Sequence, residues 1–203
     1  QVHSSRLQLG LGLGSFASTL RFDGSEEVAV TMSTISLAGA WQVNESWSLR
    51  TGLGLVYDGT LQPDNKSTSE VKQGGVFAVG LEYLHQRGEG YSPTLDYSIF
   101  MSASSAKIEN PVTHIETNYF STDLRVGGRA SWRVRDQVFP YVAGRVFGGP
   151  VSWELDDVEV TGTDIHHYQL ALGSAIQFGS LGIFAEWAGL GEKSVSTGLS
   201  YIW

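Results

Sequence analysis

Large apolar side chains recur at every second position through most of this sequence. In residues 47–58 the bulky face consists of Trp47, Leu49, Thr51, Leu53, Leu55 and Tyr57. The opposite face consists of Ser48, Arg50, Gly52, Gly54 and Asp58. Because a period of two is the repeat of an extended chain, the pattern predicts β-strands with one apolar face and one face of glycines and charges.

Ten such stretches follow one another with no helical period between them. We expect strands at residues 6–16, 28–43, 47–58, 71–86, 94–105, 117–135, 138–152, 165–178, 181–190 and 194–203. The sequence therefore predicts an all-β protein of ten strands, with eight strands as the alternative.

The connections between these stretches alternate in length. Residues 44–46, 87–93, 135–137 and 179–180 make short turns, whereas longer polar segments occupy 21–27, 61–70, 107–116 and 154–164. Short turns at one end and longer loops at the other are typical of an antiparallel up-and-down barrel. An even number of strands places both termini at the short-turn end. We expect residues 1–203 to form a single transmembrane β-barrel domain.

Aromatic side chains favour a membrane barrel over a secreted β-sandwich, which is the alternative for a strand-rich chain. On the apolar face, close to a short turn or to the C-terminus, lie Trp41, Trp47, Tyr83, Tyr97, Trp132, Phe178 and Trp203. Amphipathic rings settle at the depth of the lipid headgroups. We therefore expect these side chains to mark a membrane interface.

Composition narrows the class of protein further. The 203 residues include 25 glycines and no cysteine, so disulfides and thiolate metal sites are excluded. A formal net charge of −8 argues against nucleic-acid binding, which normally requires a basic surface. No motif for a cofactor or a structural metal is present.

The C-terminal residues "VSTGLSYIW" carry a resemblance to the bacterial outer-membrane β-barrel proteins. Val195, Leu199, Tyr201 and Trp203 match the alternating terminal signature with a closing aromatic, and "FPYVAGRV" at 139–146 looks like a segment common in small barrels. The resemblance implies a location in the bacterial outer membrane, among membrane lipid and lipopolysaccharide. It also implies that the last strand is read by the barrel-assembly machinery.

Charged residues on the inner face predict a network inside the lumen. Its members are Arg50, Glu82, Asp96, Asp123, Arg125, Arg129, Arg133, Arg145 and Glu186, with Arg6 also facing inward. Unpaired charges in a confined interior are costly, so opposite signs should pair. One hypothesis is a charge-plugged barrel whose loops contact a protein partner or the cell surface. The alternative is a narrow pore, in which an excess of arginine favours anions.

The segment "ELDDVEVTGTDIHHYQ" at 154–169 suggests an enzyme as a second alternative. Asp164 and His166 resemble half of the catalytic arrangement in the ten-stranded outer-membrane proteases, with Asp58 and Asp64 as the only candidates for the other half. A lipid-modifying enzyme is equally conceivable. The same segment includes Asp156 and Asp157, and clustered carboxylates suit Ca²⁺ or Mg²⁺, but the spacing does not fit an EF-hand. We expect a solvated acidic loop, with no metal and no enzymatic activity.

Overall fold

The computed structural model describes residues 7–22, 26–64, 67–110, 112, 114–155 and 158–203. Within them lie β1 (Leu7–Phe22), β2 (Glu26–Gln42), β3 (Trp47–Pro63), β4 (Ser69–Gln86), β5 (Thr94–Glu109), β6 (Glu116–Ser131), β7 (Val138–Gly148), β8 (Val151–Leu155), β9 (Val158–Asp164), β10 (Tyr168–Phe178), β11 (Leu181–Gly191) and β12 (Lys193–Ile202). The described residues contain no helix long and apolar enough to cross a membrane.

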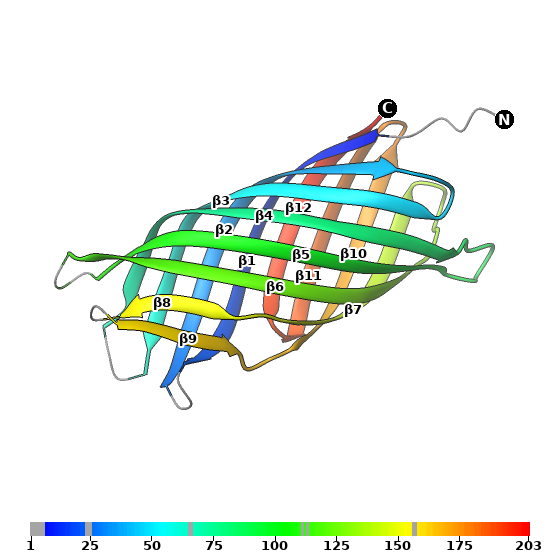
Figure 1. Cartoon of the computed structure of the whole chain (residues 1–203). Helices are drawn as coiled ribbons and strands as arrows, with labels where there is room; N and C mark the ends of the chain where they lie inside the picture. Colours follow the sequence, from blue (N-terminus) through cyan, green and yellow to red (C-terminus); the bar gives the residue numbers. More distant parts are fainter. Residues whose placement is uncertain (1–6, 23–25, 65–66, 111, 113, 156–157) are drawn as a thin grey trace.

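Ten of these strands close into a barrel. Strands β1 to β7 pair in sequence, β7 pairs with β10, and β10 to β12 follow in order (Figure 1). The circuit closes between β12 and β1, where Gly10 lies opposite Ser200 and the Trp203 amide donates to the Leu7 carbonyl. The prediction of a ten-stranded antiparallel barrel is confirmed. The end of β12 and the start of β1 lie at the end with the short turns (Figure 1).

A β-hairpin occupies the segment between β7 and β10, where the sequence predicted one long strand followed by an acidic loop. The strand predicted at 138–152 stops at Gly148, and the next begins at Tyr168 and not at 165. Between them, β8 and β9 pair with each other, Trp153 opposite Val160. The acidic residues concealed a period-two pattern in which Val151 and Trp153 are buried.

This hairpin closes a second circuit at one end of the barrel. Strand β8 pairs with β6 through Tyr119 and Trp153, and β9 pairs with β1 through Leu20 and Asp164. Strands β1 to β6 are 16 to 18 residues long, whereas β7 and β10 to β12 have only 10 or 11. The longer strands and the hairpin therefore form an eight-stranded ring, here called the outer half. The ten-stranded part is called the membrane half.

The two halves have opposite polarity on their walls, as β1 shows. In the membrane half its outward residues are Leu7, Leu9, Leu11 and Leu13, which are 40 to 59% exposed. Beyond them the outward residues become Ser15, Ala17, Thr19 and Arg21. Its inward residues change from Gln8 and three glycines to Phe16, Ser18, Leu20 and Phe22. The membrane half thus presents an apolar belt to lipid, and the outer half is built like a soluble barrel.

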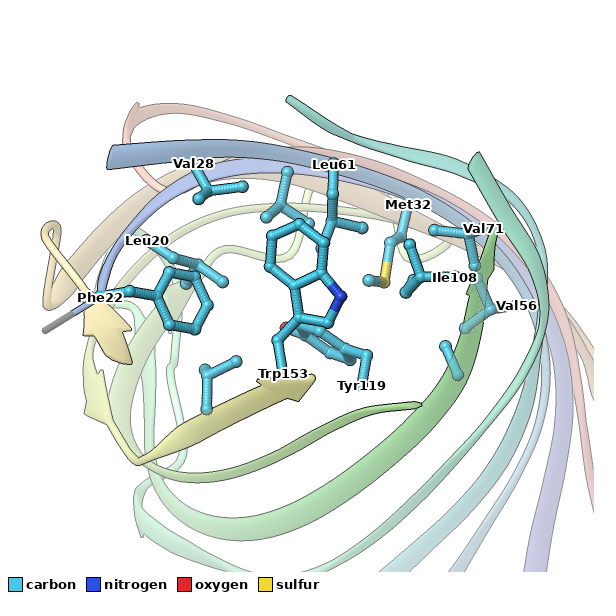
Figure 2. Packing of buried hydrophobic residues seen from close by; sticks show 13 residues of the cluster. Leu20, Phe22, Val28, Met32, Val56, Leu61, Val71, Ile108, Tyr119 and Trp153 are labelled. Atoms are coloured by element: carbon cyan, nitrogen blue, oxygen red, sulfur yellow. The ribbon is translucent and has the colours of Figure 1, made fainter. Parts of the chain in front are cut away.

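Apolar side chains fill the outer half from inside (Figure 2). The buried cluster consists of Leu20, Phe22, Val28, Val30, Met32, Val56, Leu61, Val71, Ala106, Ile108, Tyr119, Val151 and Trp153. Trp153 projects from the hairpin into the middle of this cluster, with its ring 6.1 Å from that of Phe22. Its indole Nε1 donates to the Thr117 hydroxyl at 3.1 Å. Burial of Trp153 holds the hairpin against β1 and β6.

This change of polarity explains why the predicted strands were too short. Strand β1 was expected to end at residue 16 but continues to Phe22, and β3 continues from 58 to Pro63. In β1 the period of two persists while the apolar side chains move from the outward to the inward face. A bulge opposite Ser33 and Thr34 also shifts β3 by one residue, so Asp58 lies opposite Ser33. Asp58 is therefore exposed on the outer wall, not in the lumen as predicted.

Candidate functional site

The lumen of the membrane half contains a two-point ion pair between β7 and β11. Arg145 Nη1 donates to Glu186 Oε1 at 2.7 Å, and its Nη2 donates to Oε2 at 2.8 Å. The Tyr141 hydroxyl also donates to Glu186, at 2.9 Å. Bidentate guanidinium–carboxylate pairs are the strongest class of side-chain ion pair, and this one is fixed in geometry by a third partner.

A buried glutamine connects this pair to a second one. The Gln169 side chain accepts from Arg145 Nη1 at 2.6 Å and donates to Glu192 Oε1 at 3.0 Å. Glu192 accepts in turn from Arg125 Nη1 at 3.1 Å, and Arg125 Nε lies 3.3 Å from Asp123. The result is one continuous polar chain across the inner faces of β6, β7, β10 and β11.

A separate group of charges lies nearer the short turns. Arg50 donates to Glu82 at 2.8 Å, and Glu82 lies 3.7 Å from Arg129. Arg129 Nε donates to the buried carboxylate of Asp96 at 3.0 Å. Paired charges therefore line the lumen at two levels.

The structure places the predicted lumen residues in these two groups with one exception. Arg133 follows the end of β6, is exposed, and stacks 5.9 Å from the Phe139 ring. Arg6 lies outside the described residues. Two members of these groups were not predicted: Glu192, which falls between the strands expected at 181–190 and 194–203, and Gln169, which carries no charge. The alternation of "YQLAL" places Gln169 inward and could have revealed it.

The balance of charge in the lumen differs from the expected excess of arginine. The paired residues are Arg50, Arg125, Arg129 and Arg145 against Glu82, Asp96, Asp123, Glu186 and Glu192. Carboxylates thus outnumber guanidinium groups, so the charge of these residues does not favour anions.

A cavity of about 470 Å³ lies between the polar chain and the apolar cluster of the outer half. Its charged lining residues are Asp123, Arg125, Arg145, Asp164, Glu186 and Glu192. Its apolar and aromatic lining residues include Phe16, Leu20, Val30, Met32, Val56 and Tyr119. Ser102, Ser104 and Ser121 also line it. The cavity is therefore amphipathic and of the size of a small-molecule site.

Asp164 and His166, named above as the alternative catalytic pair, are joined through the His166 backbone amide. Asp164 closes β9 and accepts hydrogen bonds from the Ser18 hydroxyl and, at 2.7 Å, from the His166 backbone amide. The imidazole of His166 lies instead beside the exposed Tyr168 ring, at 6.4 Å. No group of three or more metal-ligating side chains occurs in the described part of the chain. Asp156 and Asp157 lie outside the described residues.

The aromatic residues predicted at the membrane interface gather at the short-turn end. The ring centroids of Trp47 and Tyr83 lie 4.9 Å apart in a tilted contact, and those of Tyr201 and Trp203 lie 4.6 Å apart in an edge-to-face contact. The side chains of Trp41, Tyr97 and Phe178 are exposed, whereas Trp132 is half-buried just beyond β6.

At the tip of the outer half, two side chains contact the carboxylate of Glu109. Its carboxylate lies 2.9 Å from His114 Nδ1 and 3.1 Å from Lys72 Nζ. Hydrogen bonds from His114 and Lys72 hold the pKa of Glu109 below its ordinary value. Inside the same half, burial raises the pKa of Tyr119 to about 12, so this phenol is neutral at physiological pH.

Comparison with known proteins identifies the fold. No protein-family model matches the sequence, and no curated protein matches it. Among solved structures, the chain is similar to the translocator domain of the autotransporter NalP from Neisseria meningitidis. The TM-score is 0.52 at 16% identity, over 99% of this chain and 90% of that one. The outer membrane protein OprG from Pseudomonas aeruginosa gives a TM-score of 0.52 at 8% identity, over 98% and 96%.

These likenesses show the fold and no more, because the identities are low. The fold is that of the bacterial outer-membrane β-barrels, as the terminal segment "VSTGLSYIW" suggested. The exposed leucines of β1 belong to a belt that only lipid can cover without a large cost. The chain is therefore a transmembrane β-barrel of the outer-membrane class.

Proposed function

We propose that this protein is a non-enzymatic barrel of the bacterial outer membrane whose lumen is closed and whose outer half serves as an interaction surface. The observation that carries the proposal is double closure. Paired charges line the lumen of the membrane half, and a packed apolar cluster centred on Trp153 fills the outer half. A solute that passes through the barrel would have to displace both the lumen ion pairs and the apolar cluster.

The exposed tip of the outer half supports a role in contact with a partner. Between β5 and β6, Val112 and Ile115 are 72% and 56% exposed. Both residues are close in sequence to Glu109, which forms ion pairs with Lys72 and His114. Charged side chains therefore surround a small exposed apolar surface. A polar rim around apolar contacts is typical of protein interfaces. We propose that this tip contacts a protein partner or the cell surface.

A narrow pore is the second candidate, and the cavity inside the barrel is the observation that favours it. The arrangement of Asp164 with a backbone amide and not an imidazole gives less support to an enzyme at the rim. Lipopolysaccharide and the barrel-assembly machinery remain the predicted partners of the membrane half.

Conductance across a planar lipid bilayer tests the proposal. Refolded protein, checked for heat-modifiable migration on a gel, should show no discrete openings. Arg145→Ala removes a lumen charge, and Arg21→Ala serves as control because Arg21 pairs with Glu27 on the outer wall. Steady openings of the unaltered protein that change in Arg145→Ala but not in Arg21→Ala would establish a pore and refute the closed lumen.

A further inference from the structure

We infer that the cavity between the two halves binds a small amphipathic organic cation. The proposed function states that solutes do not pass through the barrel. The present inference is that a ligand binds inside it. The cavity has a volume of about 470 Å³ and is lined both by the ion pair of Arg145 and Glu186 and by members of the buried apolar cluster. Volumes of this size accommodate small organic molecules.

The charge on the cavity wall selects for a cation. Its carboxylates are Asp123, Asp164, Glu186 and Glu192, and its guanidinium groups are Arg125 and Arg145. Each arginine already contacts carboxylates, Arg125 those of Asp123 and Glu192 and Arg145 that of Glu186. Two negative charges therefore remain uncompensated within the described lining. The uncompensated negative charge attracts a cation to this lining.

Asp164 is the carboxylate available to such a cation. Its described partners are the Ser18 hydroxyl and the His166 backbone amide, which are neutral donors. No ion pair to Asp164 occurs in the described part of the chain, in contrast to the other three carboxylates. An ammonium group beside Asp164 gains a charge-assisted hydrogen bond without displacing an existing ion pair.

The apolar part of the lining requires an apolar group on the ligand. Leu20, Met32 and Val56 are each 5% exposed or less and line the cavity together with Phe16. A hydrated inorganic cation would leave this wall unsatisfied, and the described residues offer no group of side chains to hold a metal. Methionine adapts to ligands of varied shape. The matching chemistry is an ammonium group attached to a compact hydrocarbon or aromatic group.

The probe for this site is 2-phenylethylammonium chloride, titrated by calorimetry into the full chain in lipid nanodiscs. Two analogues of similar size, neutral 2-phenylethanol and anionic 3-phenylpropionate, separate charge from hydrophobicity. Asp164→Asn removes the proposed counter-charge. Asp58→Asn is the matched control, because Asp58 is exposed on the outer wall.

We expect the ammonium probe to bind more tightly than both analogues. Asp164→Asn should weaken its binding by about tenfold or more, the value of one charge-assisted hydrogen bond, and Asp58→Asn should leave it unchanged. Absence of binding, equal binding of the neutral analogue, or equal binding to Asp164→Asn would each overturn the inference.

A second pair of variants covers the case in which Asp164→Asn fails to fold. Ser102 lines the cavity from β5, whereas the neighbouring Ala103 lies on the outward face of the same strand. Ser102→Leu fills part of the cavity and should weaken probe binding, while Ala103→Leu should not. Equal affinities of these two variants would place the bound probe elsewhere and overturn the inference.

Discussion

Arg145 on β7 and Glu186 on β11 form a bidentate ion pair across the inner face of β10, at 2.7 and 2.8 Å. Neither residue is near the other in sequence, and both strands belong to the short-stranded side of the barrel. The pair therefore holds together the part of the wall that the outer half does not reinforce.

Loss of one partner of this pair should strongly destabilise the barrel. The Glu186 side chain is only 12% exposed, so Arg145→Ala leaves a nearly buried carboxylate without its cation. Breaking a buried pair typically costs about 3–5 kcal/mol, whereas replacing both partners by apolar residues is often neutral. We expect a large loss in Arg145→Ala and partial recovery in Arg145→Met with Glu186→Leu. Denaturant unfolding in lipid vesicles measures both.

The exposed pair of Arg21 and Glu27 is the control for this comparison. Their side chains are 50% and 38% exposed at the same 2.7 Å separation, so Arg21→Ala should cost less than about 1 kcal/mol. Equal losses in Arg21→Ala and Arg145→Ala would show that burial of the lumen pair has no energetic consequence.

Removal of Trp153 should release the hairpin from the outer half. The side chain is 2% exposed and lies at the centre of the buried cluster. Truncation of a buried tryptophan to alanine typically costs about 3–5 kcal/mol. We expect Trp153→Ala to lower stability by this amount and to make residues 149–164 susceptible to added protease, while the membrane half stays folded. Phe120→Ala, on the outward face of β6, should cost less than about 1 kcal/mol and leave the hairpin resistant.

The sequence was sufficient to predict the membrane half because lipid imposes one rule on every strand. Leu53 and Leu55 face outward and Gly52 and Gly54 inward, as their alternation predicts. The outer half was not predicted because the large apolar residues move from the outward to the inward positions of the same strand. In the sequence this change looks like the end of the strand. The hairpin was missed because Glu154 and Glu159 suggested a loop, and only contact with Leu20 and Phe22 explains the burial of Trp153.

Arginine substitutions should locate the boundary between the two polarities. Leu53 is 61% exposed within the apolar belt, and arginine on the lipid face near the bilayer centre costs about 2–4 kcal/mol. Leu53→Arg should therefore reduce stability and slow assembly in vesicles, as followed by heat-modifiable migration. Thr31→Arg lies on the polar wall of the outer half, next to Thr60, and should assemble as the unaltered protein does. Impaired assembly of Thr31→Arg would mean that the outer wall at Thr31 also faces lipid, so that the membrane covers part of the outer half.

Cross-linking tests whether β9 closes the outer ring against β1. The chain has no cysteine, so any disulfide that forms must join the two introduced thiols. Arg21 and Thr163 lie directly opposite each other on adjacent strands, a spacing that permits a disulfide. The variant with Arg21→Cys and Thr163→Cys should therefore oxidise readily in intact vesicles, as a shift on a non-reducing gel. In a control variant, Thr161→Cys replaces Thr163→Cys, which moves the second thiol two residues away from the position opposite Arg21. The yield of disulfide should then fall several-fold. Equal yields from the two variants would mean that the hairpin does not hold this register, and the eight-stranded ring would then be open between β9 and β1.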